Sequence, residues 1–566
     1  MTYTPPVAEQ RFLLRHIVRI DEITGPNGYA DATPDLVEAI IQGGGDFAAR
    51  EFAPLNRIGD EAGASWSPDG VTLPQGFRQA YQRFVEAGWP ALAGPKDHGG
   101  QGLPLVLNCV VSEDLHSANM AFALLPMLTY GAIEALRHHG SEEMKATWLA
   151  RLVTGEWPGT MNLTEPQAGS DVGALRTKAV SAGDGTYRIS GSKIFITFGE
   201  HDLTDNIVHL VLARTPDAPS GTKGISLFLV PKILPDGQRN DLRCVSIEHK
   251  LGIRASPTCV MSYGDDGQCV GWLIGEEQGG IRAMFTMMNN ARLSVGLQGV
   301  AVAEGATQAA VAYARQRIQG HRAGQPAAII EHPDVRRMLL RMMALTQASR
   351  TLCYYAYGQM DRASLGSPDA QSRTDLLTPL VKAWCTDVGV EVASLGIQVH
   401  GGMGFIEETG AAQFYRDARI APIYEGTNGI QAADLVGRKI RLENGAVLAR
   451  LIADIRTCGP AHPMLGELAD RCETAGKRLA SVPPDDALAA SYPYLTMLSV
   501  AAAGWLMAQS LQALDSEPAS AFTAAKRAAA LYFLEQVVPE AIGLDAQASA
   551  PADLLYSLPT EAFDPQ

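Results

Sequence analysis

Apolar and polar positions recur with two different periods along the chain, and the change of period divides it. From about residue 34 to residue 157, apolar residues follow mostly the 3.6-residue period of amphipathic helices. The expected helical runs there are 74–87, 105–116, 122–139 and 141–156. After Gly159, short β-rich runs separated by Gly, Pro, Asp and Asn predict the strands of one antiparallel domain. The expected strands are 187–190, 193–197, 207–213, 224–230 and 242–247.

The helical period returns at residue 280 and persists with few breakers to about residue 437, which predicts a bundle of long helices. A further helical segment follows it. A chain of 566 residues is too long for one hydrophobic core. We therefore expect a mainly α protein with a central β-domain, divided at 1–158 (N-terminal helical domain), 159–280 (middle β-domain), 281–440 (C-terminal helical bundle) and 441–566 (additional helical domain).

One stretch is long and apolar enough to raise the question of a membrane span. No charged residue occurs between Asp486 and Asp515, and residues 492–514 are mostly apolar. Polar side chains are scattered through the stretch, and no basic flank marks a cytoplasmic side. These features favour a helix buried in the additional domain or at a subunit interface over a membrane-associated one.

The charge balance narrows the classes of partner. The net charge is −15, and residues 442–566 carry seven Lys and Arg against fifteen Asp and Glu, or −8. A general nucleic-acid binder needs Lys and Arg to neutralise phosphates, so no nucleic-acid partner is expected. The eight cysteines form no CxxC pair and no Cys/His zinc spacing, so we expect no metal. Free thiols and the absence of a visible secretory signal indicate a cytoplasmic protein.

Five segments carry candidate chemistry. The segment 161–171 (MNLTEPQAGSD) crowds hydroxyls and backbone N–H groups where they can converge on a polar ring, although such clusters are usually ordinary loops. In the KIFITF run, alternation places Phe195 and Thr197 on one face of a strand, where Phe195 is either core or a platform for a planar ligand. The glycines of 398–404 (QVHGGMG) allow close backbone approach to a ligand, but they follow a helix and make no Rossmann fingerprint.

Two charged side chains complete the set. Arg317 stands at the end of a long helix, where it either reaches a phosphate or lies on a solvated face. Glu425 lies in RDARIAPIYEGTNGIQ among mostly uncharged residues. A carboxylate held among apolar groups has a raised pKa, which suits a general base, whereas a surface carboxylate is the simpler local interpretation.

The order of these motifs is far more specific than any one of them. Together they resemble the acyl-CoA dehydrogenase family over about residues 34–440. The matching segments are TEPQAGSD, KIFIT, KLGIRASPT, the long helix from Ala291-Arg292 to Arg317, QVHGGMGF and RDARIAPIYEGTNGIQ.

The resemblance implies a fold, a cofactor and a reaction. The family has an N-terminal helical domain, a middle β-domain and a C-terminal four-helix bundle. FAD binds between the β-domain and this bundle, and a neighbouring subunit completes the FAD-binding site. Its glutamate, which falls on Glu425, takes the pro-R α-proton of an acyl-CoA thioester while hydride leaves the β-carbon for flavin N5. The backbone N–H of Glu425 then helps to hold the thioester oxygen. Some relatives place the base before the helix-opening arginine, but Ala291 stands there and cannot accept a proton.

The other site residues follow by resemblance. The expected substrate contacts are Arg292, Tyr424 and Ser170. The expected flavin contacts are Met161, Thr164, Gly169, Ser170, Phe195 (where the family usually has tryptophan), Thr197, Arg317, Gln398, Gly402 and Thr427. Met161 stands where many relatives have an aromatic residue, Gly429 replaces a polar one, and residues 319–332 depart from the family pattern on the adenine side.

The resemblance also suggests partners. The expected acceptor is an electron-transferring flavoprotein, and the shared flavin site implies a homodimer or homotetramer. The extra tail resembles a larger bacterial branch whose members include an enzyme acting on a sulfur-containing acyl-CoA in dimethylsulfoniopropionate degradation. 3-Methylmercaptopropionyl-CoA and short- or medium-chain acyl-CoA are therefore candidate substrates. An acyl-CoA oxidase remains the alternative. A DNA-binding flavoprotein of this fold should carry a basic tail, and this tail is acidic.

Overall fold

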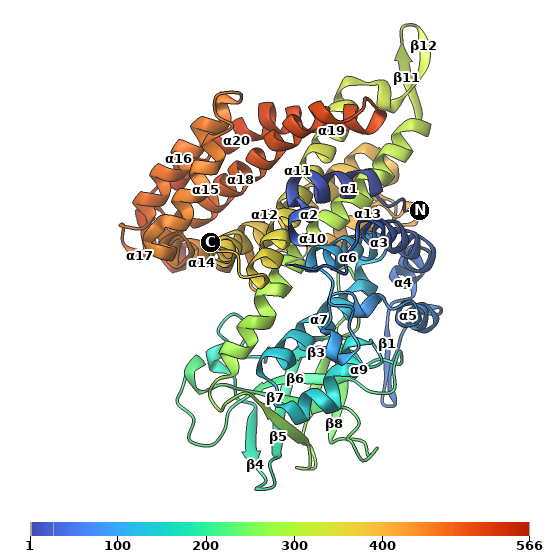
Figure 1. The fold of residues 1–566 in the computed structure, drawn as a ribbon, viewed down its shortest axis with the longest axis vertical. Coiled ribbons are helices and arrows are strands. Elements are labelled where there is room, and N and C mark those ends of the chain that lie inside the picture. The colour runs from blue at the N-terminus through green and yellow to red at the C-terminus, as the bar shows by residue number, and fades with distance from the viewer. Residues whose placement is uncertain (1–2, 26–27, 565–566) are drawn as a thin grey trace. The chain divides into compact units, whose positions relative to one another are not determined.

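The computed structural model describes residues 3–25 and 28–564 (Figure 1). The chain packs as two compact units. Unit 1 comprises Met1–Pro5 and Asp31–Ala291, and unit 2 comprises Pro6–Ala30 and Arg292–Gln566.

Unit 1 begins with helices that the 3.6-residue period predicts. A π-helical turn joins α3 to α4, and another joins α8 to α9, so the single helix expected at 141–156 is interrupted. The helix α7 starts where the Asn119 side chain accepts a hydrogen bond from the backbone N–H of Phe122 (3.2 Å), and it ends at Gly140. The elements are α3 (Pro34–Phe47), α4 (Ala53–Ala62), β1 (Ser65–Ser67), β2 (Gly70–Thr72), α5 (Phe77–Glu86), α6 (Leu105–Ala118), α7 (Met120–His139), α8 (Glu142–Met144) and α9 (Ala150–Val153).

The central sheet of unit 1 follows the order β3-β6-β7-β10-β5-β9-β8, and β4 pairs with β5. Its strands are β3 (Gly159–Asn162), β4 (Lys178–Ser181), β5 (Tyr187–Thr197), β6 (Val208–Ala213), β7 (Ser226–Pro231), β8 (Leu242–Ile247), β9 (Thr258–Tyr263) and β10 (Val270–Ile274). The prediction of antiparallel pairing is confirmed for the other pairs but is wrong for β3 and β6, which run parallel. Two expected strands merge into β5, where Gly191 continues the strand with a φ of 149°, an angle that glycine adopts readily.

Strands β3, β4, β9 and β10 escaped the sequence pattern, because each is short and none alternates cleanly. On one face of the sheet, a core cluster combines residues of α7, β3, β6 and β7. In Figure 1 the helices α7 and α9 lie against this part of the sheet. The long helix α10 (Gly280–Gln316) leaves the sheet and continues into unit 2.

Unit 2 contains the predicted long helices. They are α11 (Pro333–Ser364) and α12 (Ala370–His400), which pack on each other and are followed by α13 (Ala411–Ala418) and α14 (Asn428–Gly437). An unpredicted hairpin, β11 (Ile318–Arg322) and β12 (Gln325–Ala328), occupies the segment that departs from the family pattern. It projects from the end of α10 in Figure 1.

The additional segment is helical, as expected, and packs against α11, α12 and α14 (Figure 1). Its helices are α15 (Ala446–Arg456), α16 (Pro463–Leu479), α17 (Pro484–Ala489), α18 (Ser491–Ala513), α19 (Ala521–Tyr532), α20 (Val538–Ile542) and α21 (Asp545–Ala548). Among the described helices, one stretch, Ser491–Ser516, is long and apolar enough to span a membrane. Its most apolar window is 83% buried, which is typical of a core helix.

The N-terminal segment packs differently from the expected division, which placed it in an N-terminal domain. The short helices α1 (Val7–Leu13) and α2 (Ile20–Ile23) belong to unit 2. Lys526 of α19 donates a 2.6 Å hydrogen bond to the carboxylate of Glu9, and both side chains are buried. Phe12 packs edge-on to Phe522. These contacts join the start of the chain to its additional domain, a pairing that no local pattern announces.

Candidate active site

The predicted base lies in a turn directly before the helix α14. Glu425 has a positive φ of 56° and is followed by Gly426 with φ of 85°. Thr427 then caps α14, because its hydroxyl accepts a hydrogen bond from the backbone N–H of Ile430 (3.2 Å). A left-handed conformation is costly for a side-chain-bearing residue, so the surrounding structure must hold Glu425 in it. The turn thus holds the half-buried Glu425 at the N-terminal end of α14.

Two cations flank the Glu425 segment. Arg292, on α10 and only 6% exposed, donates from Nε to the Glu425 carbonyl oxygen (3.4 Å). Lys382, on α12, is fully buried. Burial raises the pKa of the Glu425 carboxyl, and the charges of Arg292 and Lys382 partly oppose that rise. The carboxylate therefore combines increased proton affinity with charges that stabilise its ionised form.

The neighbouring Tyr424 is anchored. Its hydroxyl donates to the side-chain oxygen of Gln298 on α10, a residue that is fully buried. Burial raises the pKa of this phenol, so it stays protonated. In unit 2 the structure thus brings together four of the predicted site residues, Arg292, Tyr424, Glu425 and Thr427.

A second group of predicted residues gathers in unit 1 where the loop after β3 meets the C-terminal half of β5. The backbone N–H of Ile194 donates to the Thr164 carbonyl (2.9 Å), so the segments 161–171 and 193–198 lie side by side. Lys193 reinforces this contact, because its ammonium donates to the Leu163 carbonyl (3.0 Å) and to the Glu165 carboxylate (2.8 Å). Two segments that the sequence singles out separately therefore form one surface.

Phe195 is not a core residue. Its side chain is 58% exposed, and its φ is 59°. The pairing of β5 with β9 shifts register between Lys193 and Ile196, which identifies a β-bulge. Ile196 is buried in the core, so Phe195 and Thr197 are directed away from it. The bulge turns an aromatic ring outward beside the Thr164 loop.

The remaining predicted residues are spread over both units. In unit 1, Met161 is buried in the core cluster, whereas Gly169 and Ser170 are exposed in the loop. In unit 2, Gln398 is exposed in the last turn of α12, and Gly402 follows it with open space where a side chain would project. Arg317 is exposed just after α10. All of these residues except the buried Met161 lie where a ligand or second subunit has access.

Two buried lysines and their partners were not predicted from the sequence. Glu165 and Lys193, 4% and 0% exposed at their side chains, form an ion pair inside the predicted flavin surface. Although burial alone would raise the pKa of Glu165, the Lys193 charge and donors from Thr177 and Arg176 lower it to about 2. The second lysine is Lys382, whose partner is Asn428 (2.9 Å). The signal available for Lys382 was one lysine within the apolar run 376–385.

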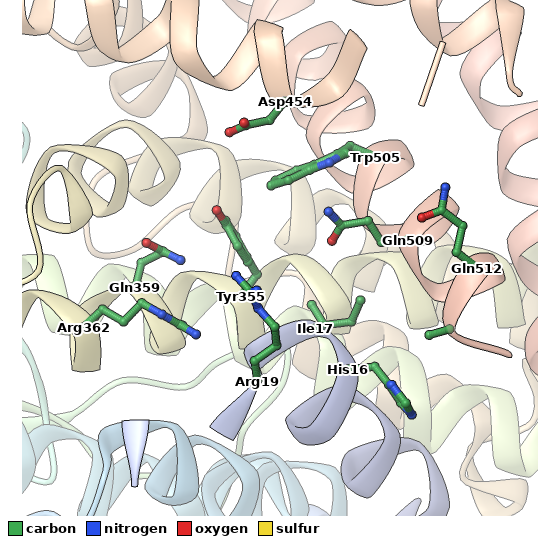
Figure 2. Close-up of a pocket in the computed structure, with 11 residues that line it drawn as sticks. His16, Ile17, Arg19, Tyr355, Gln359, Arg362, Asp454, Trp505, Gln509 and Gln512 are labelled. Atoms are coloured by element: carbon green, nitrogen blue, oxygen red, sulfur yellow. The ribbon is translucent and has the colours of Figure 1, made fainter. Parts of the chain in front are cut away.

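A cavity of about 590 Å³ lies elsewhere in unit 2, between the N-terminal segment, α11, α15 and α18. Figure 2 shows polar side chains around it, among them His16, Arg362 and Asp454. These side chains already have polar partners: Arg362 contacts Glu22 (3.0 Å), His16 contacts Glu517 (2.7 Å) and Asp454 contacts Arg373 (2.7 Å). None of the predicted site residues lines it.

Comparison with protein families matches four consecutive parts of the chain. The N-terminal domain of acyl-CoA dehydrogenases matches residues 38–156, the middle domain matches 160–265 and the C-terminal domain matches 278–440. A family described as acetyl-CoA dehydrogenase C-terminal like matches 456–559.

Relatives similar to this chain carry related names. The 3-methylmercaptopropionyl-CoA dehydrogenase of Ruegeria pomeroyi is 48% identical, with 95% of this chain and 97% of the relative covered. A butyryl-CoA dehydrogenase of Syntrophomonas wolfei is 35% identical, with 80% and 78% covered. An acyl-CoA dehydrogenase structure from Bacillus anthracis, complexed with FAD, has a TM-score of 0.76 at 21% identity, with 96% and 93% covered, and so supports the fold. Neither the oxidase nor the DNA-binding alternative is favoured by these relatives. The chain belongs to the acyl-CoA dehydrogenase family.

Proposed function

We propose that Glu425 is the base with which this acyl-CoA dehydrogenase removes the α-proton of its thioester substrate. The observation that carries the proposal is the setting of this carboxylate, half-buried in a left-handed turn with its pKa raised by burial. An α-C–H beside a thioester is weakly acidic, so the enzyme must also stabilise negative charge on the thioester oxygen. The start of α14 supplies the positive end of a helix dipole beside the turn.

FAD is the cofactor of this family, and the residues present fit it. The exposed Phe195 ring offers a flat apolar platform beside the Thr164 loop, where a Cβ at Gly169 would meet no atom within 4 Å. When bound, FAD supplies the hydride acceptor for the β-carbon. The chain's own part is to orient that cofactor and to hold the proton acceptor at the Glu425 carboxylate.

The favoured substrate is 3-methylmercaptopropionyl-CoA, with short- and medium-chain acyl-CoA as the next candidates. The relative of that name covers nearly the whole chain, including the additional domain. A panel of acyl-CoA thioesters assayed with an artificial electron acceptor tests this proposal. The highest kcat/KM is expected for 3-methylmercaptopropionyl-CoA. A clear preference for a straight-chain substrate would overturn the assignment, and oxygen consumption without an acceptor would favour an oxidase.

The physiological setting is part of the proposal. We infer that an electron-transferring flavoprotein accepts the electrons in the cytoplasm and that the enzyme assembles at least as a homodimer. The exposure of Arg317 leaves its side chain available to a neighbouring subunit. Sedimentation of the purified holoenzyme tests the assembly, and a monomer that retains full activity would contradict it.

Replacing Phe195 with glycine separates cofactor binding from folding. The ring is 58% exposed, so its loss removes little buried area, and glycine tolerates the φ of 59° without strain. We expect an unchanged or slightly higher thermal midpoint together with weaker FAD binding, measured by flavin fluorescence titration of apoprotein. A clearly lower thermal midpoint that accompanies the weaker FAD binding would show that Phe195 serves the fold instead.

The pH dependence of flavin reduction should report the raised pKa of Glu425. The base acts in its ionised form, so activity is present above its pKa and is lost as pH falls through that value. Because burial raises the pKa, the loss on acidification should begin above the ordinary glutamate value of about 4.3. Single-turnover rates across pH measure this limb. A rate that stays constant down to that ordinary value would contradict the proposed environment.

A further inference from the structure

A chain of hydrogen bonds runs from the additional domain to the segment that carries Glu425. Tyr492, near the start of α18, donates from its hydroxyl to one carboxylate oxygen of Asp387 (2.6 Å). The other oxygen of Asp387 accepts from the Asn428 side-chain amide (2.9 Å). The amide oxygen of Asn428 accepts from the Lys382 ammonium (2.9 Å). Four side chains from α18, α12 and α14 thus form one continuous chain.

Asn428 is the centre of this chain. It is 3% exposed, and it opens α14 directly after the Glu425 turn. Its amide nitrogen also lies 3.0 Å from both the Ala383 carbonyl and the Thr386 hydroxyl, so its two N–H groups are shared among three acceptors. A side chain with every hydrogen-bonding group engaged has one orientation, and it passes that constraint to the backbone that follows Glu425. The position of the turn therefore depends on α12 and on the side chain that hydrogen-bonds to Asp387, which is Tyr492.

Tyr492 is the only contribution of the additional domain to this chain within the described residues. We propose that Tyr492 is a positioning residue for the dehydrogenation: through Asp387, Asn428 and Lys382 it fixes the turn and the charge beside Glu425. The additional domain then serves the active site directly and is more than a structural extension. This inference rests on the proposed role of Glu425 as the base.

The charged groups around these hydrogen bonds determine the direction in which losing the Tyr492 hydroxyl should shift the proton affinity of Glu425. Lys382 faces Glu425, Asp387 and Arg292, and burial lowers its pKa to about 7, against the effect of the two carboxylates. Asp387 faces Tyr492, Asn428, Lys382 and Arg419, and burial raises its pKa while those four partners lower it. Loss of the Tyr492 hydroxyl therefore favours neutral Asp387. Without that negative charge Lys382 loses its proton more readily, and Glu425 loses a cation that keeps it ionised.

The test compares Tyr492→Phe with Tyr494→Phe in the holoenzyme. Both changes remove one hydroxyl from α18, but no hydrogen-bond partner for the Tyr494 hydroxyl is found among the residues the structure describes. We expect Tyr492→Phe to move the acidic limb of flavin reduction to higher pH and to lower kcat about tenfold, as for a lost bond to a charged group, with KM little changed. Tyr494→Phe should leave both parameters unchanged. An unshifted profile in Tyr492→Phe, whatever its thermal midpoint, would overturn the inference.

A double-mutant cycle provides the second test. If Tyr492 acts through Asp387, the effect of Tyr492→Phe on kcat should largely vanish in an Asp387→Asn background, because the two changes interrupt one chain. Effects that multiply independently would show that Tyr492 does not act by this route.

Hydrogen exchange makes the inference testable without turnover. The backbone amides of residues 424–430 should exchange faster in Tyr492→Phe than in the wild type or in Tyr494→Phe. If the wild type fails to reduce its flavin with any acyl-CoA, the proposed function fails, while the exchange result still decides whether Tyr492 holds the turn. Unchanged exchange in Tyr492→Phe would contradict the positioning role.

Discussion

Replacing Glu425 with glutamine is expected to lower turnover by roughly 10²- to 10⁴-fold, the range for loss of a general base. The amide keeps the size and hydrogen-bonding shape of the side chain but cannot accept the α-proton. FAD content should stay at the wild-type level, because Glu425 is not one of the predicted flavin contacts. Acyl-CoA affinity, measured by calorimetry, should change far less than kcat.

Glu443 offers a matched control for this substitution. It is also a glutamate of unit 2 with a positive φ, here 50°, but its carboxylate pairs at the surface with Arg450 (2.7 Å). Glu443→Gln therefore makes the same chemical change in a similar backbone conformation, away from the Glu425 turn. We expect wild-type turnover from it. Equal losses in both variants would show that the Glu425 effect is not specific to the base.

The largest expected effect on stability comes from Lys193→Met. The change leaves the Glu165 carboxylate buried without its cation, and breaking a buried pair in this way costs about 3–5 kcal/mol. The loop of residues 161–171 also loses the Lys193 bond to Leu163, so FAD affinity should fall with it. Thermal unfolding and flavin titration measure the two effects. A thermal midpoint close to that of the wild type would contradict the role given to the pair.

An exposed pair in the same sheet provides the comparison. Arg243 of β8 contacts Asp265 at 2.6 Å, with side chains 68% and 39% exposed. Arg243→Met should cost at most about 1 kcal/mol, because solvent screens surface pairs. The buried pair also predicts acid sensitivity. Glu165 has a lowered pKa, so its stabilisation is present above the unfolded value of about 4.3 and is lost as pH falls toward about 2.

Local patterns predicted most of the helical framework. Strong amphipathic or apolar periodicity marked α5, α6, α7 and the long helices of unit 2, where many residues share one period. Short strands such as β9 and β10 carried too few residues for a clear alternation, and the parallel pairing of β3 with β6 joins segments separated by a long stretch of chain. The attachment of the N-terminal segment to α19 depends on the ion pair between Glu9 and Lys526, which no local sequence pattern reveals.

The site shows the same division between local and non-local information. The ordered motifs nominated Glu425 and Phe195 as site residues, but their left-handed backbone was not predictable, because φ depends on neighbours that meet only in the fold. The partners of Lys382 come from α14, and those of Lys193 come from another loop. A lone lysine in an apolar run signals a buried charge, yet it does not identify the group that satisfies that charge.

The central claim is that Glu425 starts the oxidation of an acyl-CoA by this chain. The most direct measurement is anaerobic mixing of 3-methylmercaptopropionyl-CoA with the holoenzyme and its Glu425→Gln variant, followed by the flavin absorbance near ~450 nm. We predict rapid bleaching in the wild type and a stable band in the variant under the same conditions. Comparable bleaching in both proteins would contradict the assignment of Glu425 as the base.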